Sequence, residues 1–428
     1  MRASLEFPKF NQLRAFAATA RRQSMTSAAA ELRLSQPALT QSITKLETWI
    51  GDKLLERERG GSFVTPSGYT FARRVGRFFS QLEFAILEPI GGGPIVDAVH
   101  SAAMLAKLRS IHIQVLIAVA ASASFEEAAR RLGIQRPVLQ RVARELEQIL
   151  RRQLYDRRGL GFTTSAHGLE LARRWRIALR EIEYGVEEIF AQKGRVGSRI
   201  VIGSMHLVSA TLLARALNNV ASEFPHARFQ IVEMRYGELL NALRNGDIDL
   251  AYGMLRAPSG YNDIVEEILF HDPYVIVVRR GHPLSNANKK LTLRDLMAYE
   301  WIMPAAGGLR SQSFDQLFAG VRKPPLVRIE TTSVKMQKEL IVSSDRITLF
   351  TRSEMMKDEN QIRLISLPSV HRIPKNADGL ITRAGWLPTP IQLRLLMLLR
   401  EYSSSEGKAS EKSVTGSAPT DWSILNVS

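Results

Sequence analysis

The chain has 428 residues, of which 45% are hydrophobic, so it can bury ordinary cores, and its length suggests about three domains. It contains no cysteine, which excludes disulfides, a thiolate nucleophile and cysteine-based zinc or iron–sulfur sites. The longest apolar run, roughly Val115 to Ala123, is too short to span a bilayer and lies far from the N-terminus, where a signal peptide would stand. We therefore expect a cytoplasmic protein without a membrane partner.

The positive charge is concentrated in the N-terminal half. The formal net charge is +16. Residues 1–195 contain about 30 Lys or Arg against about 19 Asp or Glu, and the remainder contains about 28 against about 23. Such an excess is typical of proteins that bind a polyanion, because cations that neutralise phosphates release condensed counterions. A solvated basic face that serves solubility is the alternative, so the sequence pattern must decide.

One pattern occurs twice in this half. The segment AAELRLSQPALTQSITKLE (Ala29 to Glu47) is followed 100 positions later by ARRLGIQRPVLQRVARELE (Ala129 to Glu147), and the two agree at many apolar positions. The offset holds without a gap over about 75 residues, and Gly68 and Gly168 stay in register. Chance rarely aligns glycines as well as apolar positions, so the register predicts a duplicated structural unit.

Three short helices are predicted in the first copy, over Asn11 to Arg22, Thr26 to Leu32 and Gln36 to Thr48. Ser35 is well placed as the N-cap of the third helix, and Pro37 falls in its first turn, where a missing N–H costs nothing. This is the layout of a helix-turn-helix. The third helix would present amides, hydroxyls and a cation outward, and such groups suit base edges and phosphates.

A short hairpin and a long helix are expected next, over Leu54 to Thr65 and Ser67 to Leu87. The series AAAELRLSQPALTQSITKLE, GDKLLER and VTPSG resembles, in order and spacing, the winged helix-turn-helix of LysR-type transcriptional regulators. The resemblance implies that the third helix recognises DNA. It also implies that the long helix is the linker helix through which family members form dimers.

The residues expected to contact DNA lie on the third helix of each copy and at the tip of the first hairpin. They are Ser35, Gln36, Pro37, Thr40, Gln41, Thr44, Lys45 and Arg59 in the first copy, and Gln135, Arg136, Gln140, Arg141 and Arg144 in the second. Gln side chains pair well with adenine and Arg side chains with guanine, so the two copies would prefer different half-sites. The alternative is a second copy that is kept only for packing, with its arginines solvated.

From Arg199 onward, short β-rich segments alternate with helical ones, which predicts α/β layers. The segments FPHARFQIVEMRYGELLNALRNGDIDLAYG and LFHDPYVIVVRRGHPL resemble the effector domain of the same family, most of all in its sugar-responsive branch. The resemblance implies the two-lobed fold of periplasmic solute-binding proteins and a small polar effector, such as a sugar or an organic acid, bound between the lobes.

In such a fold, strand ends and helix N-termini present hydroxyl and N–H groups to the effector. The candidates at these places are Ser204, Met205, His206, Gly253, Met254, Ala306, Gly307, Thr331, Thr332 and Ser333. Ordinary capping of helices and turns is the alternative role for each of them.

The predicted fold is therefore mixed: two tandem, mainly α, winged helix-turn-helix domains with long linker helices, then a two-lobed α/β effector domain. The expected boundaries are 8–88 for the first winged domain, 89–104 for a flexible linker with a Gly-Gly-Gly-Pro stretch, 105–193 for the second winged domain, 198–402 for the effector domain and 403–428 for a disordered tail.

We expect the linker helices Ser67 to Leu87 and His167 to Phe190 to pack antiparallel within the chain, as the resemblance implies for two chains of a family dimer. The apolar residues expected between them are Phe71, Val75, Phe78, Leu82, Leu171, Trp175, Leu179 and Ile182. The alternative is an exchange of these helices between two chains, which would bring four winged domains together in one dimer.

The sequence predicts a DNA-binding transcription regulator of bacterial type, with double-stranded DNA and a small-molecule effector as partners, no cofactor, and a homo-oligomer through the effector domains. Ser42-Ile43-Thr44-Lys45 fits the Ser-x-x-Lys form of serine acyltransferases but lies on the recognition helix without companion motifs. The eight histidines lack metal-binding spacing. An enzyme or a transport solute-binding protein built on the α/β domain is the alternative, and the latter would need a signal peptide.

Overall fold

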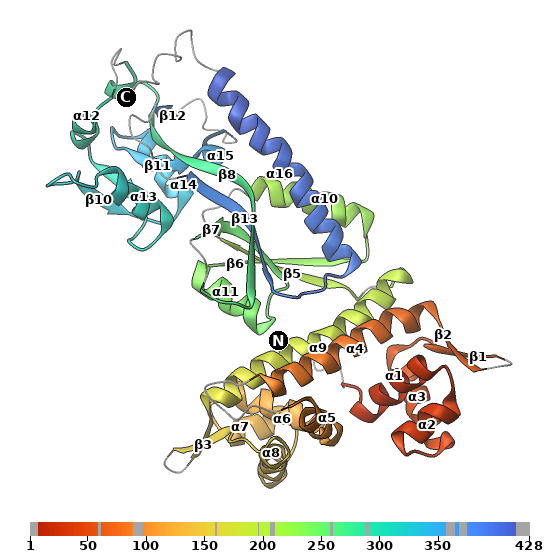
Figure 1. Cartoon of the computed structure of the whole chain (residues 1–428). Helices are drawn as coiled ribbons and strands as arrows, with labels where there is room; N and C mark the ends of the chain where they lie inside the picture. The colour runs from red at the N-terminus through yellow and green to blue at the C-terminus, as the bar shows by residue number, and fades with distance from the viewer. Residues whose placement is uncertain are drawn as a thin grey trace. The chain divides into compact units, whose positions relative to one another are not determined.

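The computed structural model describes residues 7–58, 61–88, 97–158, 161–195, 197–205, 210–256, 260–286, 291–356, 364–367 and 375–416. The chain divides into two compact units, Met1–Arg199 and Ile200–Ser428, and each is described by itself (Figure 1). Among the described residues no single helix is long and apolar enough to cross a membrane, although the bent pair Val99–Lys107 and Ser110–Ala120 passes a test of length and composition together.

The first winged unit consists of four helices and a hairpin. In chain order these are α1 (Phe10–Arg22), α2 (Met25–Leu32), α3 (Gln36–Ile50), β1 (Leu55–Glu58), β2 (Gly61–Val64) and α4 (Pro66–Leu87). The helix boundaries lie within two residues of those predicted. The expected cap is present, since the Ser35 hydroxyl accepts from the backbone N–H of Ala38.

The second winged unit has the same element order. It consists of α6 (Ser110–Ala120), α7 (Phe125–Leu132), α8 (Arg136–Leu150), β3 (Tyr155–Arg158), β4 (Gly161–Thr164) and α9 (Ala166–Gln192). In both units the hairpin is antiparallel and pairs four residues with four. The same local patterns of apolar spacing and caps therefore produce the same local structure twice.

An equivalent glutamate carboxylate, buried in the first winged unit and half-buried in the second, fixes the hairpin in both. Glu47 accepts backbone hydrogen bonds from Leu54 and Leu55 at 3.0 and 3.2 Å. Its equivalent, Glu147, accepts those of Leu154 and Tyr155 at 2.8 and 3.1 Å. A carboxylate that accepts two backbone N–H groups satisfies donors that the hairpin leaves without a ladder partner.

The start of the long helix is also fixed in the same way in both units. Thr65 and Ser165 cap α4 and α9 by accepting from the N–H of Gly68 and Gly168. A Cβ at Gly68 would lie 2.1 Å from the carbonyl oxygen of Leu54, so the helix approaches the hairpin too closely for any side chain.

The predicted antiparallel packing of the two long helices is confirmed within the chain. Thr70, near the start of α4, bonds Gln192 at the end of α9, and Glu88, just after α4, pairs with Arg174 near the start of α9 (Figure 1). The predicted apolar residues lie in one core shared by both winged units. Seven of them are buried, and Leu179 is half-buried against the same core.

The region expected to be a flexible linker contains a helix, which corrects that prediction. Helix α5 (Ala98–Lys107) begins after Asp97, whose side chain accepts from the N–H of His100. The Ser101 hydroxyl donates to Glu83 of α4 at 2.9 Å, and Met104 packs against the shared core. The helix forms because it has a cap and an apolar face that α4 covers. The Gly-Gly-Gly-Pro stretch lies outside the described residues.

The C-terminal unit, Ile200–Ser428, is built on a sheet in which the described residues form seven strands. Their order is β11-β8-β13-β7-β5-β6, and β12 also pairs with β8. Its strands are β5 (Arg199–Met205), β6 (Arg228–Met234), β7 (Leu250–Leu255), β8 (Ile264–Arg279), β11 (Thr348–Thr351), β12 (Leu364–Leu367) and β13 (Lys375–Arg383). Strand β8 is long enough to serve two lobes. Its first part pairs with β13, and its last part pairs with β11 and β12.

The first lobe surrounds β5, β6 and β7. Helix α11 (Tyr236–Asn245) packs on this sheet, and α10 (Ala210–Glu223) lies beside α16 (Pro390–Gly416) (Figure 1). The second lobe adds the parallel strands β9 (Trp301–Met303) and β10 (Val327–Glu330). Its helices are the short η1 (Pro283–Asn286), α12 (Leu293–Met297), α13 (Leu309–Leu317), α14 (Val334–Val342) and α15 (Arg352–Met356).

The predicted tail needs correction, because α16 continues through Ser403, where a disordered tail was expected, to Gly416. The helix is anchored by residues that are buried in the first lobe, among them Leu395 and Leu399. Ala, Glu and Lys after Ser403 are good helix formers and extend it. Residues 417–428 lie outside the described residues.

Candidate nucleic-acid interface and effector region

The outer face of α3 is polar and exposed. Leu39, Ile43 and Leu46 are buried beneath it, as the spacing predicted. The predicted DNA-contacting residues on this face are exposed except for Thr40, which is half-buried; they are Ser35, Gln36, Pro37, Thr40, Gln41, Thr44 and Lys45. The helix therefore presents hydrogen-bonding side chains over about three turns of one face, which suits a major groove.

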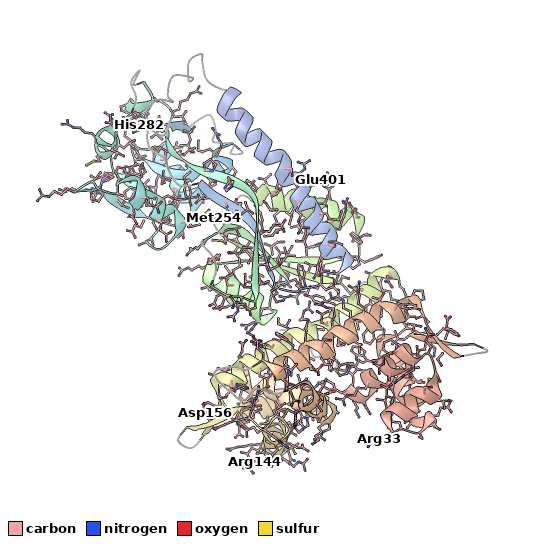
Figure 2. The ribbon with its side chains drawn as sticks, viewed as in Figure 1. Arg33, Arg144, Asp156, Met254, His282 and Glu401 are labelled. Atoms are coloured by element: carbon pink, nitrogen blue, oxygen red, sulfur yellow. The ribbon has the colours of Figure 1, made fainter. Side chains whose placement is uncertain are left out.

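The outer face of α8 carries more positive charge than that of α3. Arg136, Arg141 and Arg144 are exposed where the first winged unit has two glutamines and a threonine. Arg144 is labelled in Figure 2. Gln135 is exposed and makes no capping hydrogen bond, and Gln140 is half-buried.

Arg136 has a nearby acidic neighbour. Its Nη1 atom lies 3.6 Å from Glu126 of α7, and the two side chains are 49% and 65% exposed. An ion pair this exposed contributes about 0–1 kcal/mol. The guanidinium therefore remains available to a ligand that approaches the outer face.

The turn before the recognition helix differs between the units. Arg33 has φ of 54° at the end of α2, and its equivalent Gly133 has φ of 65° at the end of α7. Glycine adopts this left-handed conformation without strain, whereas other residues do so at a cost of roughly 1–2 kcal/mol. The first unit thus keeps a cation at the turn despite the strain (Figure 2). Arg59, predicted at the hairpin tip, lies outside the described residues.

In the first lobe, the predicted effector residues meet at the ends of neighbouring strands. Strands β5 and β7 are parallel, so their carboxyl ends lie at the same edge. A Cβ at Gly253 would lie 2.8 Å from the Met205 side chain, so these two positions are in contact. Ser204 is half-buried beside them, and His206 lies outside the described residues.

Met254 links this edge to the second lobe. It is buried in one cluster with Met303 and Trp301, and it accepts a hydrogen bond from the Tyr274 hydroxyl at 3.4 Å (Figure 2). Burial raises the pKa of Tyr274 to about 12. The hydroxyl therefore stays protonated and serves as a donor at ordinary pH.

In the second lobe, the predicted residues follow the parallel strands β9 and β10. The N–H of Thr331 donates to the carbonyl of Met303 at 3.0 Å, so the segments after the two strands begin side by side. Ala306, Gly307 and Thr332 are exposed. The Ser333 hydroxyl caps α14 by accepting from Met336 at 3.3 Å, which is the capping role considered as the alternative.

A buried charge cluster behind Thr331 was missed from the sequence. Arg310 is buried and donates to Gln337 at 3.0 Å and to both carboxylate oxygens of Glu354. Gln337 donates in turn to the Thr331 carbonyl at 2.6 Å. An arginine and a glutamine on otherwise separate amphipathic helices gave only a weak signal, because nothing in local spacing brings them together.

No group of three or more His, Asp or Glu side chains that could hold a metal ion occurs in the described part of the chain.

Comparison with known families settles what these two units are. The family model described as "Bacterial regulatory helix-turn-helix protein, lysR family" matches residues 10–69 and again residues 111–168. The model described as "LysR substrate binding domain" matches residues 193–404. The chain belongs to the LysR family of transcriptional regulators. Members of this family are DNA-binding transcription regulators with an effector-binding domain and are not enzymes, so the enzyme and transport alternatives fall away.

Similar LysR regulators differ in how much of this chain they cover. The transcriptional regulator GalR of Pseudomonas putida is 26% identical over 404 residues, which is 94% of this chain and 99% of that protein. PcaQ of Agrobacterium fabrum is 28% identical over 298 residues, 69% of this chain and 95% of its own. TdcA of Escherichia coli is 24% identical over 298 residues, with 69% and 94% covered. The GalR alignment is long enough to include both winged units.

Proposed function

We propose that both winged units contact DNA, the first with the outer face of α3 and the second with that of α8. We further propose that a small polar metabolite bound between the two lobes of the C-terminal unit controls this contact. Residues 8–88 and 105–193 then form two DNA-binding domains, residues 198–402 form the effector domain, and the protein works in the cytoplasm.

The observation that carries the DNA-binding proposal is the shared exposure pattern of α3 and α8. Both helices bury the apolar positions that face their own unit, and both leave polar or cationic side chains exposed at equivalent outward positions. A packing module would gain nothing from three exposed arginines on one helix face. Bases and phosphates would pair with them.

Support for the effector site comes from the strand ends. Ser204, Met205 and Gly253 lie at one edge of the first lobe, and in the second the segments that follow β9 and β10 begin side by side, where Thr331 bonds Met303. Ligands of open α/β sheets bind outside the carboxyl ends of strands. The Arg310–Gln337 cluster would hold the second-lobe segment in place for such a ligand.

Mobility shifts with duplex DNA from the promoter region of its own gene test the function. Specific binding at low salt is expected, and added metabolite should change the affinity or the footprint. Absence of specific binding at low salt, both with and without candidate metabolites, would contradict the proposal. A thermal-shift screen of sugars, sugar acids and aromatic acids would identify the effector class, because bound ligand stabilises the folded state by mass action.

A further inference from the structure

The charged groups at the α4–α9 contact are distributed unequally between the two helices. Glu181 of α9 is 3% exposed and bonds Arg74 at 2.7 Å, Arg77 at 3.1 Å and Gln81 at 3.0 Å, all of which belong to α4. Arg74 is fully buried and also bonds Glu188. One glutamate thus receives hydrogen bonds from three side chains of α4, and a second glutamate of α9, Glu188, receives those of Arg73 and Arg74.

Gln81 and Glu181 occupy equivalent positions in the two winged units, 100 residues apart. Because equivalent positions face each other, the pseudo-twofold axis that relates the two helices passes between them. A pair of identical helices would place the same residue on both sides of this axis. Two copies of α9 would therefore bring Glu181 against Glu181.

Two copies of α9 would keep Arg174, the equivalent of Arg74, but would lack the second cation that offsets such a contact. The residue equivalent to Arg77 is Ile177, so Glu181 would lose one of its three partners and exchange Gln81 for a like charge. Two buried carboxylates in contact cannot both stay ionised without a large cost. Self-pairing of α9 is therefore strongly disfavoured.

Two copies of α4 would meet a steric obstacle at another point. In the observed pair, Gly185 of α9 lies against Phe71 and Arg74, and a Cβ there would stand 2.9 Å from the Phe71 ring. The residue of α4 equivalent to Gly185 is Ala85. An α4–α4 pair would bring that Cβ against Phe71, and it would leave Arg74 facing Gln81 in place of Glu181.

The connection between the helices favours pairing within one chain. Ser101 of α5 bonds Glu83 near the end of α4, so the chain folds back along α4 directly after leaving it. Helix α5 ends at Lys107, and α6 of the second winged unit begins at Ser110. The second winged unit is thereby held beside the α4 helix of its own chain.

We infer that α4 and α9 form a selective unlike pair within one chain, so that each chain presents two different recognition helices as one DNA-binding body. This inference rests on the proposed function for its consequence, which is recognition of an operator with two unlike half-sites by a single chain. The pairing itself does not depend on DNA and can be tested without it.

Cross-linking in the full-length protein gives the first test, because the natural chain contains no cysteine. The Thr70 and Gln192 side chains are 3.0 Å apart across the pair. Cysteine is shorter than glutamine, so a short thiol-reactive bifunctional reagent is used to bridge the gap. With this reagent the Thr70→Cys/Gln192→Cys variant should give a cross-linked monomer at all protein concentrations. A covalent dimer as the main product would overturn the inference in favour of helices exchanged between chains.

The Gln81→Cys variant reports on like pairs, because two α4 helices would place this cysteine against itself at the axis. We expect no covalent dimer from it, and an abundant one would overturn the inference.

The Gln81→Glu variant recreates the Glu–Glu contact within the chain and should lower the unfolding midpoint of the unit Met1–Arg199, which contains both winged units. Adding Glu181→Gln should restore it, because the contact again holds one glutamate and one glutamine; failure to restore it would refute charge selection.

The outcomes separate this inference from the proposed function. A cross-linked monomer that binds no DNA would leave the pairing intact and refute DNA binding. A protein that binds DNA specifically but cross-links as a dimer would refute the pairing alone.

Discussion

The two winged units share a scaffold and differ on their surfaces. Positions that fix the scaffold keep the same chemistry, as with Glu47 and Glu147 at the hairpins and the caps at the start of α4 and α9. The outward positions of the recognition helices have changed from amides and a hydroxyl in the first unit to arginines in the second. The two winged units therefore fold alike and present different side chains on the exposed faces of α3 and α8.

The largest difference in the free energy of unfolding between equivalent substitutions is expected at Arg74 and Arg174. Arg74→Met should destabilise the first unit by about 3–5 kcal/mol, because it leaves Glu181 and Glu188 buried without their main partner. Arg174→Met is the matched control and should cost less, about 1 kcal/mol, since Arg174 and its partners Glu88 and Glu170 are all partly exposed, at 22%, 43% and 24%. Urea unfolding of both variants measures this difference, and equal losses would contradict it.

The second comparison concerns charge on the recognition helices. In the Arg141→Gln/Arg144→Thr variant the second winged unit receives the residues of the first winged unit at these two positions. The DNA-binding constant falls as salt is added. If both arginines contact phosphates, the plot of the logarithm of this constant against the logarithm of salt concentration should become shallower by about 1.8, at about 0.9 per phosphate. The matched control, Gln41→Arg/Thr44→Arg, should raise the slope. Salt titrations of DNA binding measure this, and an unchanged slope in the first variant would show that the two arginines do not reach phosphates.

The helix caps give the third comparison. Ser35 accepts a hydrogen bond at the start of α3, whereas Gln135 makes none at the start of α8. Ser35→Ala should therefore cost about 1 kcal/mol of stability, and Gln135→Ala should cost almost nothing. Chemical denaturation separates the two variants. A loss of the same size at Gln135 would mean that its side chain stabilises α8 in another way.

The smallest expected effect is a pH dependence of stability that is confined to the second winged unit. The His112 ring nitrogen accepts from the backbone N–H of Arg109 at 3.1 Å, where the first unit uses Gln12 and Lys9. Burial lowers the pKa of His112, the charge of Arg109 adds to this, and Glu145 opposes it. The unfolded chain then binds the proton more readily than the folded protein.

The stability that His112 contributes is therefore complete above about pH 6.5 and is lost as the pH falls from there through the lower folded-state pKa. His112→Gln, which copies the first unit, should remove this part of the pH dependence. Urea midpoints of the two proteins between pH 5 and pH 8 measure it. Parallel curves for the variant and the natural protein would rule out the effect.

The winged units could be predicted well from sequence because their signals are local. Apolar spacing and caps determine where α1, α3 and α4 begin and end, and the repeated register carried the assignment to the second unit. The role of Glu47 could not be predicted, since its carboxylate acts through a tertiary contact with the hairpin. The one available signal was that a glutamate also stands at position 147.

The C-terminal unit, Ile200–Ser428, was harder to predict because its strands serve two lobes. Strand β8 runs from Ile264 to Arg279, and its first part, which contains two glutamates, forms because β13 pairs with it. Strand β13 itself contains Asp378 and Gly379, which have low strand propensity, so tertiary pairing decides its structure. The cluster of Arg310 with Glu354 likewise joins two separate helices.

Footprinting of single variants on one operator tests most directly the central claim that one chain recognises two unlike half-sites. Gln36→Ala and Arg136→Ala should each weaken binding by about 1–3 kcal/mol and should lose protection in different halves of the same operator. Loss of protection in opposite halves, at a stoichiometry of one chain per pair of half-sites, is the predicted result. If Arg136→Ala leaves every contact unchanged, the second winged unit is a packing module and the claim is wrong.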